Sequence, residues 1–410
     1  MRGGTSKALF FRREELPADP ELRDRVILAA YGSPDPFRRQ LDGIGGATSS
    51  TSKVAVVGPS GGPGTDIDYL FGQVGIDAPL IDWGGNCGNI SAAVGPFAIE
   101  EGWVPPGQPI TPVRIFNVNT QKVILAHVPV ADGTFLAEGD FAIQGVPGMG
   151  AKILLEYLDP GGSVTSRTLP TGHARDRFSV PGLGQVEVSV IDAANPLVVC
   201  RAEALGLSGI ESPAAMDADG VLMARLEALR GQAAAACGLA RTPEEAAERS
   251  PAIPKVAVVA PARSFRATDG TMVDASEVDL VGRVVSMGRV HSSFALTSAI
   301  GTAVGALLPG TVIYEVVAAG TGRGPSPLLT KEGRGGGHTG WVRLGHPAGA
   351  MEALGVTVEP VAGEWHVVKV SSNRTARRLM DGGVYVPASL FPATIRAATV
   401  RERSPAVPRP

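Results

Sequence analysis

The chain has 410 residues, of which 44% are hydrophobic and 19% are charged. Its net charge of −3 provides no basic field for a nucleic acid, and its three cysteines are too few for a disulfide framework. One hydrophobic core supports roughly 250–300 residues, so we expect two domains, in a reducing cytoplasm.

The N-terminal segment 1–11, MRGGTSKALFF, lacks the layout of a signal peptide. After it, 53 glycines and 33 prolines separate many short runs rich in Val, Ile and Thr, a pattern typical of β-strands joined by turns. The strands that we expect are, in chain order, 52–57, 66–76, 113–117, 122–130, 185–191, 196–202, 255–259, 311–317, 338–344 and 365–370.

Two long helices are predicted at 89–101 and 297–308, and they resemble each other. Each follows small polar residues, is rich in Ala and Gly, and ends at a Gly or Pro signal. They start about half the chain apart, which indicates a tandem duplication: an α+β fold in which each half wraps β-structure around one buried helix. The apolar stretch 299–320 is broken by Pro309 and Gly310 and carries Glu315, so we do not interpret it as a membrane span.

The duplication predicts a first domain over 1–183 and a second over 184–383. A stretch rich in Ala, Glu and Arg, 213–247, is predicted as a surface helical excursion of the second domain, and a C-terminal strand over 384–400 is expected to complete the first. Cys200 and Cys237 are interpreted as packing residues.

Two glycine-rich stretches are weak motifs. Residues 335–340, GGGHTG, match a dinucleotide fingerprint, but no apolar strand leads into them and a strand-like WVRL follows where a helix is required. Residues 45–53, GGATSSTSK, lack the glycine that precedes the lysine of a phosphate loop. Because the six histidines never fall at metal-ligand spacing, we expect no metal and no cofactor.

The most informative stretch is GNCGN at 85–89, where Cys87 precedes the first predicted helix. Its backbone N–H groups and the positive end of the helix dipole favour an anion. Lys53 begins the apolar run KVAVV. One amine and one thiol at an anion-binding helix end predict a proton-transfer site for a carboxylate substrate.

Four segments rich in Gly, Ser and Thr share this anion-friendly character. They are 2–7 (RGGTSK), 43–53 (GIGGATSSTSK), 85–89 (GNCGN) and 343–349 (RLGHPAG). Any one of them is equally well explained as a turn in a glycine-rich β-protein. Together, and without a nucleotide motif, they favour a small di- or tricarboxylic acid as ligand.

Several strings together resemble the PrpF family over nearly the whole chain: MRGGTSK, GSPD, DGIGG, TSKVAVV, DYLFGQV, GNCGNISAAVGPFAIE, TARRLMDG and VYVP. That family includes isomerases of unsaturated tricarboxylic acids, such as 2-methylaconitate cis-trans isomerase and 4-oxalomesaconate tautomerase. The resemblance implies a diaminopimelate-epimerase-like fold: two tandem domains, each a β-barrel-like sheet around a central helix, with the active site in the interdomain cleft.

The resemblance also implies roles for individual residues. Lys53 and Cys87 correspond to the pair that acts on the substrate, with the neutral amine of Lys53 as general base and Cys87 as a second acid/base or a substrate-holding group. The expected substrate contacts are Arg2, Thr5, Ser6, Lys7, Ser52, Asn86, Gly88, Asn89, Thr297, Ser298 and His346. The expected reaction is allylic proton transfer through a dienolate, which backbone amides at both helix starts stabilise.

Two other functions stay open at this point. An amino-acid racemase of the same fold would use two cysteines, one beside each central helix, whereas the second helix offers only Thr297, Ser298 and Thr302. A non-catalytic carboxylate-binding protein would keep the anion-binding loops without needing Lys53. Whether the reaction is geometric or positional isomerisation also stays open, as does a homodimer.

Overall fold

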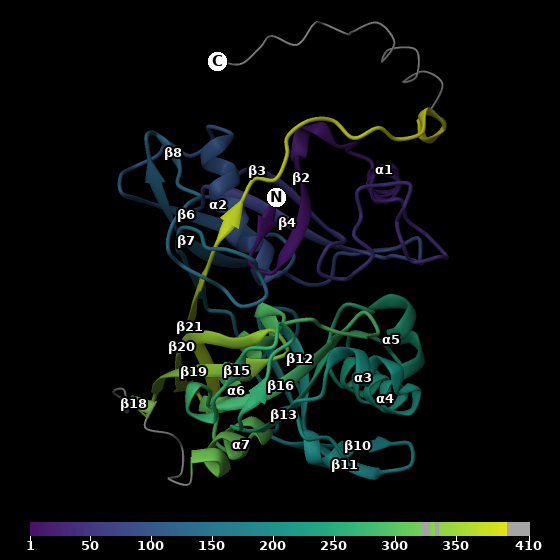
Figure 1. Ribbon diagram of the computed structural model, residues 1–410, viewed down its shortest axis with the longest axis vertical. Coiled ribbons are helices and arrows are strands. Elements are labelled where there is room, and N and C mark those ends of the chain that lie inside the picture. The colour runs from purple at the N-terminus through teal and green to yellow at the C-terminus, as the bar shows by residue number, and fades with distance from the viewer. Residues whose placement is uncertain (322–328, 333–335, 392–410) are drawn as a thin grey trace, which may run out of the picture.

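The computed structural model describes residues 1–321, 329–332 and 336–391 (Figure 1). It confirms an α+β fold, in which one continuous hydrogen-bonded sheet system runs through an upper and a lower body. Within the described residues, no single helix is long and apolar enough to cross a membrane, although helices α6 and α7, bent by 74° at their junction, pass together on length and composition.

The upper body in Figure 1 is built by the first part of the chain around helix α2. Helix α1, which the sequence analysis missed, begins where the Asp19 carboxylate accepts the N–H of Leu22. The elements are β1 (Arg2–Gly3), β2 (Ser6–Arg12), η1 (Arg13–Glu15), α1 (Pro20–Tyr31), β3 (Lys53–Pro59), β4 (Ile67–Val74), β5 (Ile81–Asp82), α2 (Gly88–Glu100), β6 (Ile110–Asn117), β7 (Lys122–Ala131), β8 (Thr134–Phe135) and β9 (Ile153–Leu158).

The lower body surrounds helix α6. Its strands and short helices are β10 (Asp176–Val180), β11 (Gly184–Ala193), β12 (Asn195–Arg201), η2 (Ala202–Leu205), β13 (Lys255–Pro261), β14 (Phe265–Arg266), β15 (Met272–Val273), η3 (Ala275–Glu277), β16 (Leu280–Ser286), β17 (Arg289–Val290), β18 (Leu329–Glu332), β19 (His338–His346), β20 (Gly349–Val361) and β21 (Glu364–Arg374). Its α-helices are α3 (Pro213–Ala218), α4 (Gly220–Ala236), α5 (Pro243–Arg249), α6 (Leu296–Leu307) and α7 (Val312–Thr321), so the helical excursion predicted over 213–247 is confirmed.

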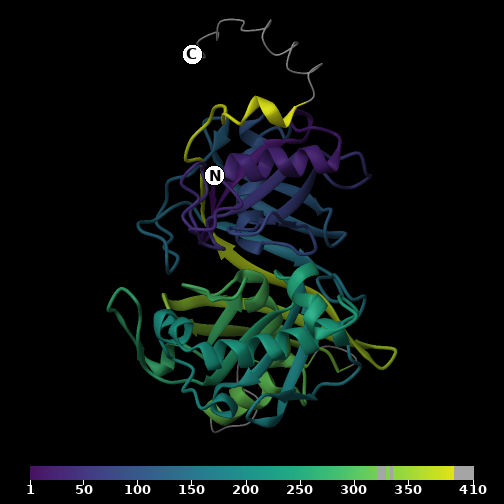
Figure 2. The same ribbon diagram turned by 90° about the vertical axis from the view of Figure 1, so that its right-hand side faces the viewer.

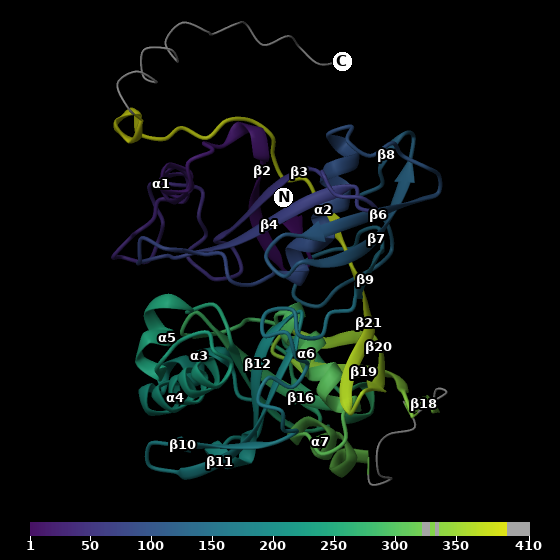
Figure 3. The ribbon, with the colours of Figure 1, turned by 180° about the vertical axis from the view of Figure 1, so that it is seen from behind.

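Figures 1 and 3 show the two bodies from opposite sides, and the strand pairings of the two bodies follow one order. From β1 through β2, β3, β4, β6 and β7 to β9, successive pairs are antiparallel, parallel, antiparallel, parallel, antiparallel and antiparallel. From β11 through β12, β13, β16, β19 and β20 to β21, the directions follow the same order. The second and fourth strand pairs are therefore parallel in both bodies, and each such pair requires a crossover connection.

Strands β9 and β21 join the two bodies, because Ile153–Leu158 pairs antiparallel with the second half of β21. Beyond β21 the chain passes from the lower body to the upper one, as Figure 2 shows, and β22 (Ala376–Arg377) pairs with β1. The first and last parts of the described chain are thus hydrogen-bonded neighbours.

The central helices α2 and α6 are almost completely buried, α6 along its whole length and α2 from Gly88 to Ile99. Small residues allow this. A Cβ added at Gly95 would lie 2.7 Å from Val128 Cγ2, and one added at Gly88 would lie 3.0 Å from Leu296 Cγ. The second contact places the first residues of α2 and α6 against each other.

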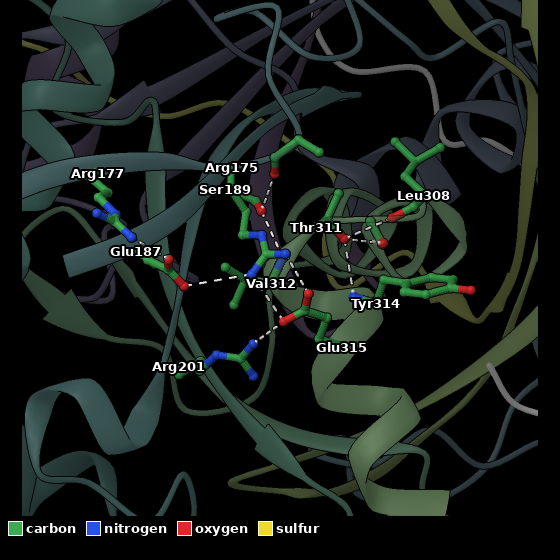
Figure 4. A network of polar contacts seen from close by, with 12 residues as sticks. Arg175, Arg177, Glu187, Ser189, Arg201, Leu308, Thr311, Val312, Tyr314 and Glu315 are labelled. Atoms are coloured by element: carbon green, nitrogen blue, oxygen red, sulfur yellow. Dashed lines mark hydrogen bonds and ion pairs between the residues drawn. The ribbon is translucent and has the colours of Figure 1, made fainter. Parts of the chain in front are cut away.

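The prediction of a strand over 311–317 is wrong, because helix α7 begins at Val312 (Figure 4). The Thr311 hydroxyl donates to the Gly305 carbonyl (2.6 Å) and accepts the N–H of Tyr314 (3.1 Å), while the N–H of Val312 donates to Ser189 Oγ (2.9 Å). The buried side chains are 312, 313, 316 and 317, a helical period that a β-branched composition concealed. Arg175 and Arg201 fix the helix through Glu315.

The C-terminal strand expected over 384–400 is not formed in its described part. Residues 384–391 contain the short helix η4 (Ala388–Leu390), and 392–400 lie outside the described residues. Gly382 has φ +137°, which residues with a side chain rarely adopt, and Pro387 lacks the N–H that a ladder requires. The two-residue strand β22 occupies the edge beside β1 instead.

Candidate active site

A cavity of about 20 Å³ lies where α2 and α6 begin. It brings together seven of the residues singled out in the sequence: Ser6, Lys53, Asn86, Cys87, Gly88, Asn89 and Thr297. Polar or aromatic residues that the sequence analysis missed complete its lining: Phe71, Gln73, Asp82, Asn195, Lys255, Ser286 and His291.

Lys53 is the first residue of β3, and its side chain is only 8% exposed. Its Nζ donates to Gln73 Oε1 (2.8 Å) and lies 5.3 Å from the centre of the Phe71 ring. The Gln73 amide in turn donates to the carbonyls of Ser52 (2.9 Å) and Ser49 (3.2 Å). The orientation of the amine is therefore fixed by the loop before β3 and by the neighbouring strand β4.

Cys87 stands at the N-terminal boundary of α2 with an extended backbone, and its carbonyl accepts the hydroxyl of Ser91 (3.0 Å). The residue before it is held from the other body. Asn195 accepts the N–H of Asn86 and donates to its carbonyl, both at 2.8 Å, and also donates to Thr297 Oγ1 (3.2 Å). One buried amide thus connects the starts of both central helices.

Lys255 and His291 are cavity residues that the sequence analysis missed. Burial, with the charges of Lys53 and Lys255, lowers the pKa of His291 to about 3, so its imidazole is neutral at pH 7. Its Nδ1 accepts the N–H of Ser293 (3.1 Å). Burial and the charge of Lys53 lower the pKa of Lys255 to about 8.

A second cavity of about 470 Å³ adjoins the first across a chain of hydrogen bonds. Asn89 donates to Thr5 Oγ1 (3.1 Å) and accepts from Arg374 Nε (3.2 Å), and Thr5 accepts from Ser293 Oγ (3.2 Å). Thr5 and His346 line this larger cavity and not the smaller one. Burial lowers the pKa of His346 to about 3 and that of the Arg374 guanidinium to about 10.

Four other expected substrate contacts line neither cavity. The Arg2 Nη1 donates to the Gly4 carbonyl (3.1 Å) and to the carbonyl and hydroxyl of Thr375 (both 2.9 Å), so it holds β1 against the residue that follows β21. The Ser52 hydroxyl donates to Gln40 Oε1 (2.6 Å). Ser298 is buried within α6, and Lys7 lies on β2 outside both linings.

The described residues contain no group of three His, Cys, Asp or Glu side chains placed to hold a metal ion. Of the glycine-rich stretch 335–340, residue 335 lies outside the described part and His338 begins strand β19. The groups that line the smaller cavity include two amines, a thiol, a neutral imidazole, the Asp82 carboxylate and the N–H groups of a helix start. This set suits proton transfer on an anionic molecule.

Residues 1–387 match the family described as PrpF protein. The chain is 41% identical over 387 residues to the 3-methylitaconate isomerase of Eubacterium barkeri, covering 94% of this chain and 96% of that one. It is 40% identical over 398 residues to the 2-methyl-aconitate isomerase of Shewanella oneidensis, covering 94% and 96%. It is also 40% identical over 387 residues to the 4-oxalomesaconate tautomerase of Pseudomonas putida, covering 94% of each chain.

A solved structure is similar over the same length. The crystal structure of methylitaconate-delta-isomerase has a TM-score of 0.71 and 38% identity, with 100% of this chain and 97% of that chain covered.

Proposed function

The chain belongs to the PrpF family and is an isomerase, and on that premise we propose that it isomerises an unsaturated di- or tricarboxylic acid by allylic proton transfer. The observation that carries this proposal is the meeting of Lys53 and Cys87 in one cavity at the start of α2. A buried amine, a thiol and the N–H groups of a helix start that no side chain caps match what the removal of a proton beside a carboxylate requires.

In the proposed mechanism, the neutral amine of Lys53 removes a proton from the carbon next to the double bond. The electron pair of that C–H bond becomes a new carbon–carbon π bond, and the original π pair moves towards the far carbon and its conjugated carboxylate. The N–H groups that follow Cys87 stabilise the charge of this dienolate. Because the reaction moves one proton and no net electrons, it requires no oxidant or reductant.

The return of the proton decides the product. Delivery to the far carbon shifts the double bond, whereas rotation in the dienolate followed by delivery to the original carbon changes cis to trans. We assign the delivery to Cys87, since it lies at the start of α2 and lines the same cavity as Lys53. The alternative role of Cys87 is to hold a substrate carboxylate.

We also propose that the two bodies are tandem diaminopimelate-epimerase-like domains and that the reaction occurs in the cleft between them. The repeated pairing order supports this. Since β10 pairs with β11, we place the domain boundary before Asp176 and not at 183. A cavity of about 20 Å³ holds about one water molecule, so the proposal requires the domains to move apart to admit a substrate.

A racemase that uses two thiols is disfavoured by the cavity lining. Cys87 is the single cysteine among the described residues that line it. Cys200 is fully buried in β12, where burial raises the pKa of its thiol to about 12, and Cys237 follows α4.

The test is turnover in deuterated water with the three acids that the relatives' names provide: 3-methylitaconate, 2-methylaconitate and 4-oxalomesaconate. Proton NMR follows both conversion and exchange at the allylic carbon. We expect conversion of at least one acid, and its loss in Lys53→Ala. Binding of the acids without conversion or exchange of any would refute the proposed allylic proton transfer and favour simple binding of carboxylates.

A further inference from the structure

Strands β3 and β13 carry nearly the same sequence, KVAVVGP and KVAVVAP. Each runs parallel to the strand before it in the pairing order, with Ala8 opposite Lys53 in one body and Leu197 opposite Lys255 in the other. Lys255 is therefore the structural counterpart of Lys53. Both side chains line the same small cavity, so the repeat places two amines beside Cys87.

The two lysines differ in their partners. Lys53 lies opposite Gln73 in the register of β3 and β4, and Gln73 accepts its hydrogen bond. In the other body, Val256 pairs with Val285, so the next position places Ser286 opposite Lys255. The serine side chain is too short to replace the glutamine. Among the described residues, none accepts a hydrogen bond from the Lys255 side chain or forms an ion pair with it.

The charges around Lys255 favour the binding of an anion. Lys53 on β3, Cys87 before α2, Asp82 on β5 and His291 after β17 face it. The carboxylate of Asp82 already accepts the N–H groups of Gly84 (2.8 Å) and Ala252 (3.0 Å). The imidazole is neutral at pH 7, so the cavity holds two amines and only one carboxylate.

We propose that Lys255, as an ammonium ion, is a further catalytic residue that binds the substrate carboxylate conjugated with the reacting carbons and stabilises the charge of the dienolate. This proposal rests on the proposed function. It divides the work between the repeated lysines: Lys53, held by Gln73, moves the proton, and Lys255, left without a partner, binds the anion. An ammonium beside the developing charge acts more strongly in a cavity lined by protein than it does in bulk solvent.

The experiment measures binding and turnover separately. Tricarballylate, a saturated tricarboxylate without a double bond to move, serves as the binding probe in calorimetry. The variants are Lys255→Met, Lys255→Arg and, as a matched control, Lys369→Met, which removes an exposed lysine of β21 paired with Glu156. Circular dichroism and thermal melting check that each variant folds.

We expect Lys255→Met to weaken tricarballylate binding by about ten- to hundred-fold, the effect of losing a charge-assisted hydrogen bond. Lys369→Met should bind as the wild type does. Because the pKa of Lys255 is lowered to about 8, wild-type affinity should fall by about ten-fold between pH 7 and pH 9. Lys255→Arg, which stays charged, should bind at pH 7 and lose that decrease.

Unchanged binding by a folded Lys255→Met protein would overturn the proposal, as would a wild type that does not bind tricarballylate at pH 7. If Lys255→Met does not fold, the pH profiles of the wild type and Lys255→Arg decide, and identical profiles would reject the assignment. Turnover of the three unsaturated acids by the wild type reports independently on the proposed function. A protein that turns them over but binds tricarballylate without dependence on Lys255 would retain the function and lose this inference.

Discussion

Replacing Asn195 by alanine should loosen the start of α2 while leaving the two bodies folded. Its side-chain amide is 2% exposed and makes three hydrogen bonds: two with the backbone of Asn86 and one with Thr297. Alanine removes all three and leaves a buried N–H and a buried carbonyl without a protein partner. Each such group costs about 1–3 kcal/mol, which gives about 2–6 kcal/mol in total.

The structure favours the lower part of that range. Asn195 lines the small cavity, and removing its amide enlarges a space that already holds about one water, so water can replace some of the lost bonds. We therefore expect a local destabilisation of about 2–3 kcal/mol. Turnover should fall as well, because the segment that Asn195 holds leads directly into Cys87.

Hydrogen exchange is the suitable assay, because it reports local opening in a chain too large for two-state unfolding. Peptides that contain Asn86 should exchange about 30- to 150-fold faster in Asn195→Ala. Asn373→Ala is the matched control, since its side chain forms no hydrogen bond within the described residues. An exchange rate at Asn86 within a factor of two of the wild type would refute the reasoning.

Four further outcomes are expected. Lys53→Ala should lower kcat by about 10²–10⁴, and a near-normal kcat in the folded variant would refute the role of Lys53 as general base. Cys87→Ser should lower kcat while nearly preserving tricarballylate binding; weaker binding at unchanged kcat would assign Cys87 to substrate holding. Arg2→Ala should lower the melting temperature without changing KM, because the guanidinium holds Thr375, and a raised KM at unchanged stability would contradict this. The pKa of His346 is lowered to about 3 from 6.5 in the folded protein, so below pH 6.5 only the unfolded chain protonates this histidine. The free energy of unfolding is therefore unaffected by His346 above pH 6.5 and decreases as the pH falls. Between pH 7 and pH 5 the free energy of unfolding should decrease by about 2 kcal/mol because of this histidine. His346→Gln should lose less stability over that interval than the wild type.

The sequence by itself determined the two central helices, nine of the ten strands predicted from it, and seven of the residues that line the small cavity. Hydrophobic periodicity and the residues that begin and end a helix depend only on local sequence. The starts of α2 and α6 were therefore predicted to within one residue. GNCGN and the lysine of KVAVV were recognisable because they occur together with other segments rich in groups that bind anions, although each alone is equally well explained as a turn. Residues 311–317 were misread because β-branched composition and helical burial conflict there.

The tertiary structure decided which polar residues share one space. Nothing in the run PKVAVVAP distinguishes Lys255 from a surface lysine, although its likeness to KVAVVGP was a signal that could have found it. Arg2 was expected to bond either a substrate carboxylate or a loop that shapes the site, and the structure shows its hydrogen bonds to Thr375, far away in sequence. Asn195 was invisible because its role exists only where two bodies meet. Such contacts depend on pairings between residues a hundred or more positions apart, and no local pattern of side chains encodes them.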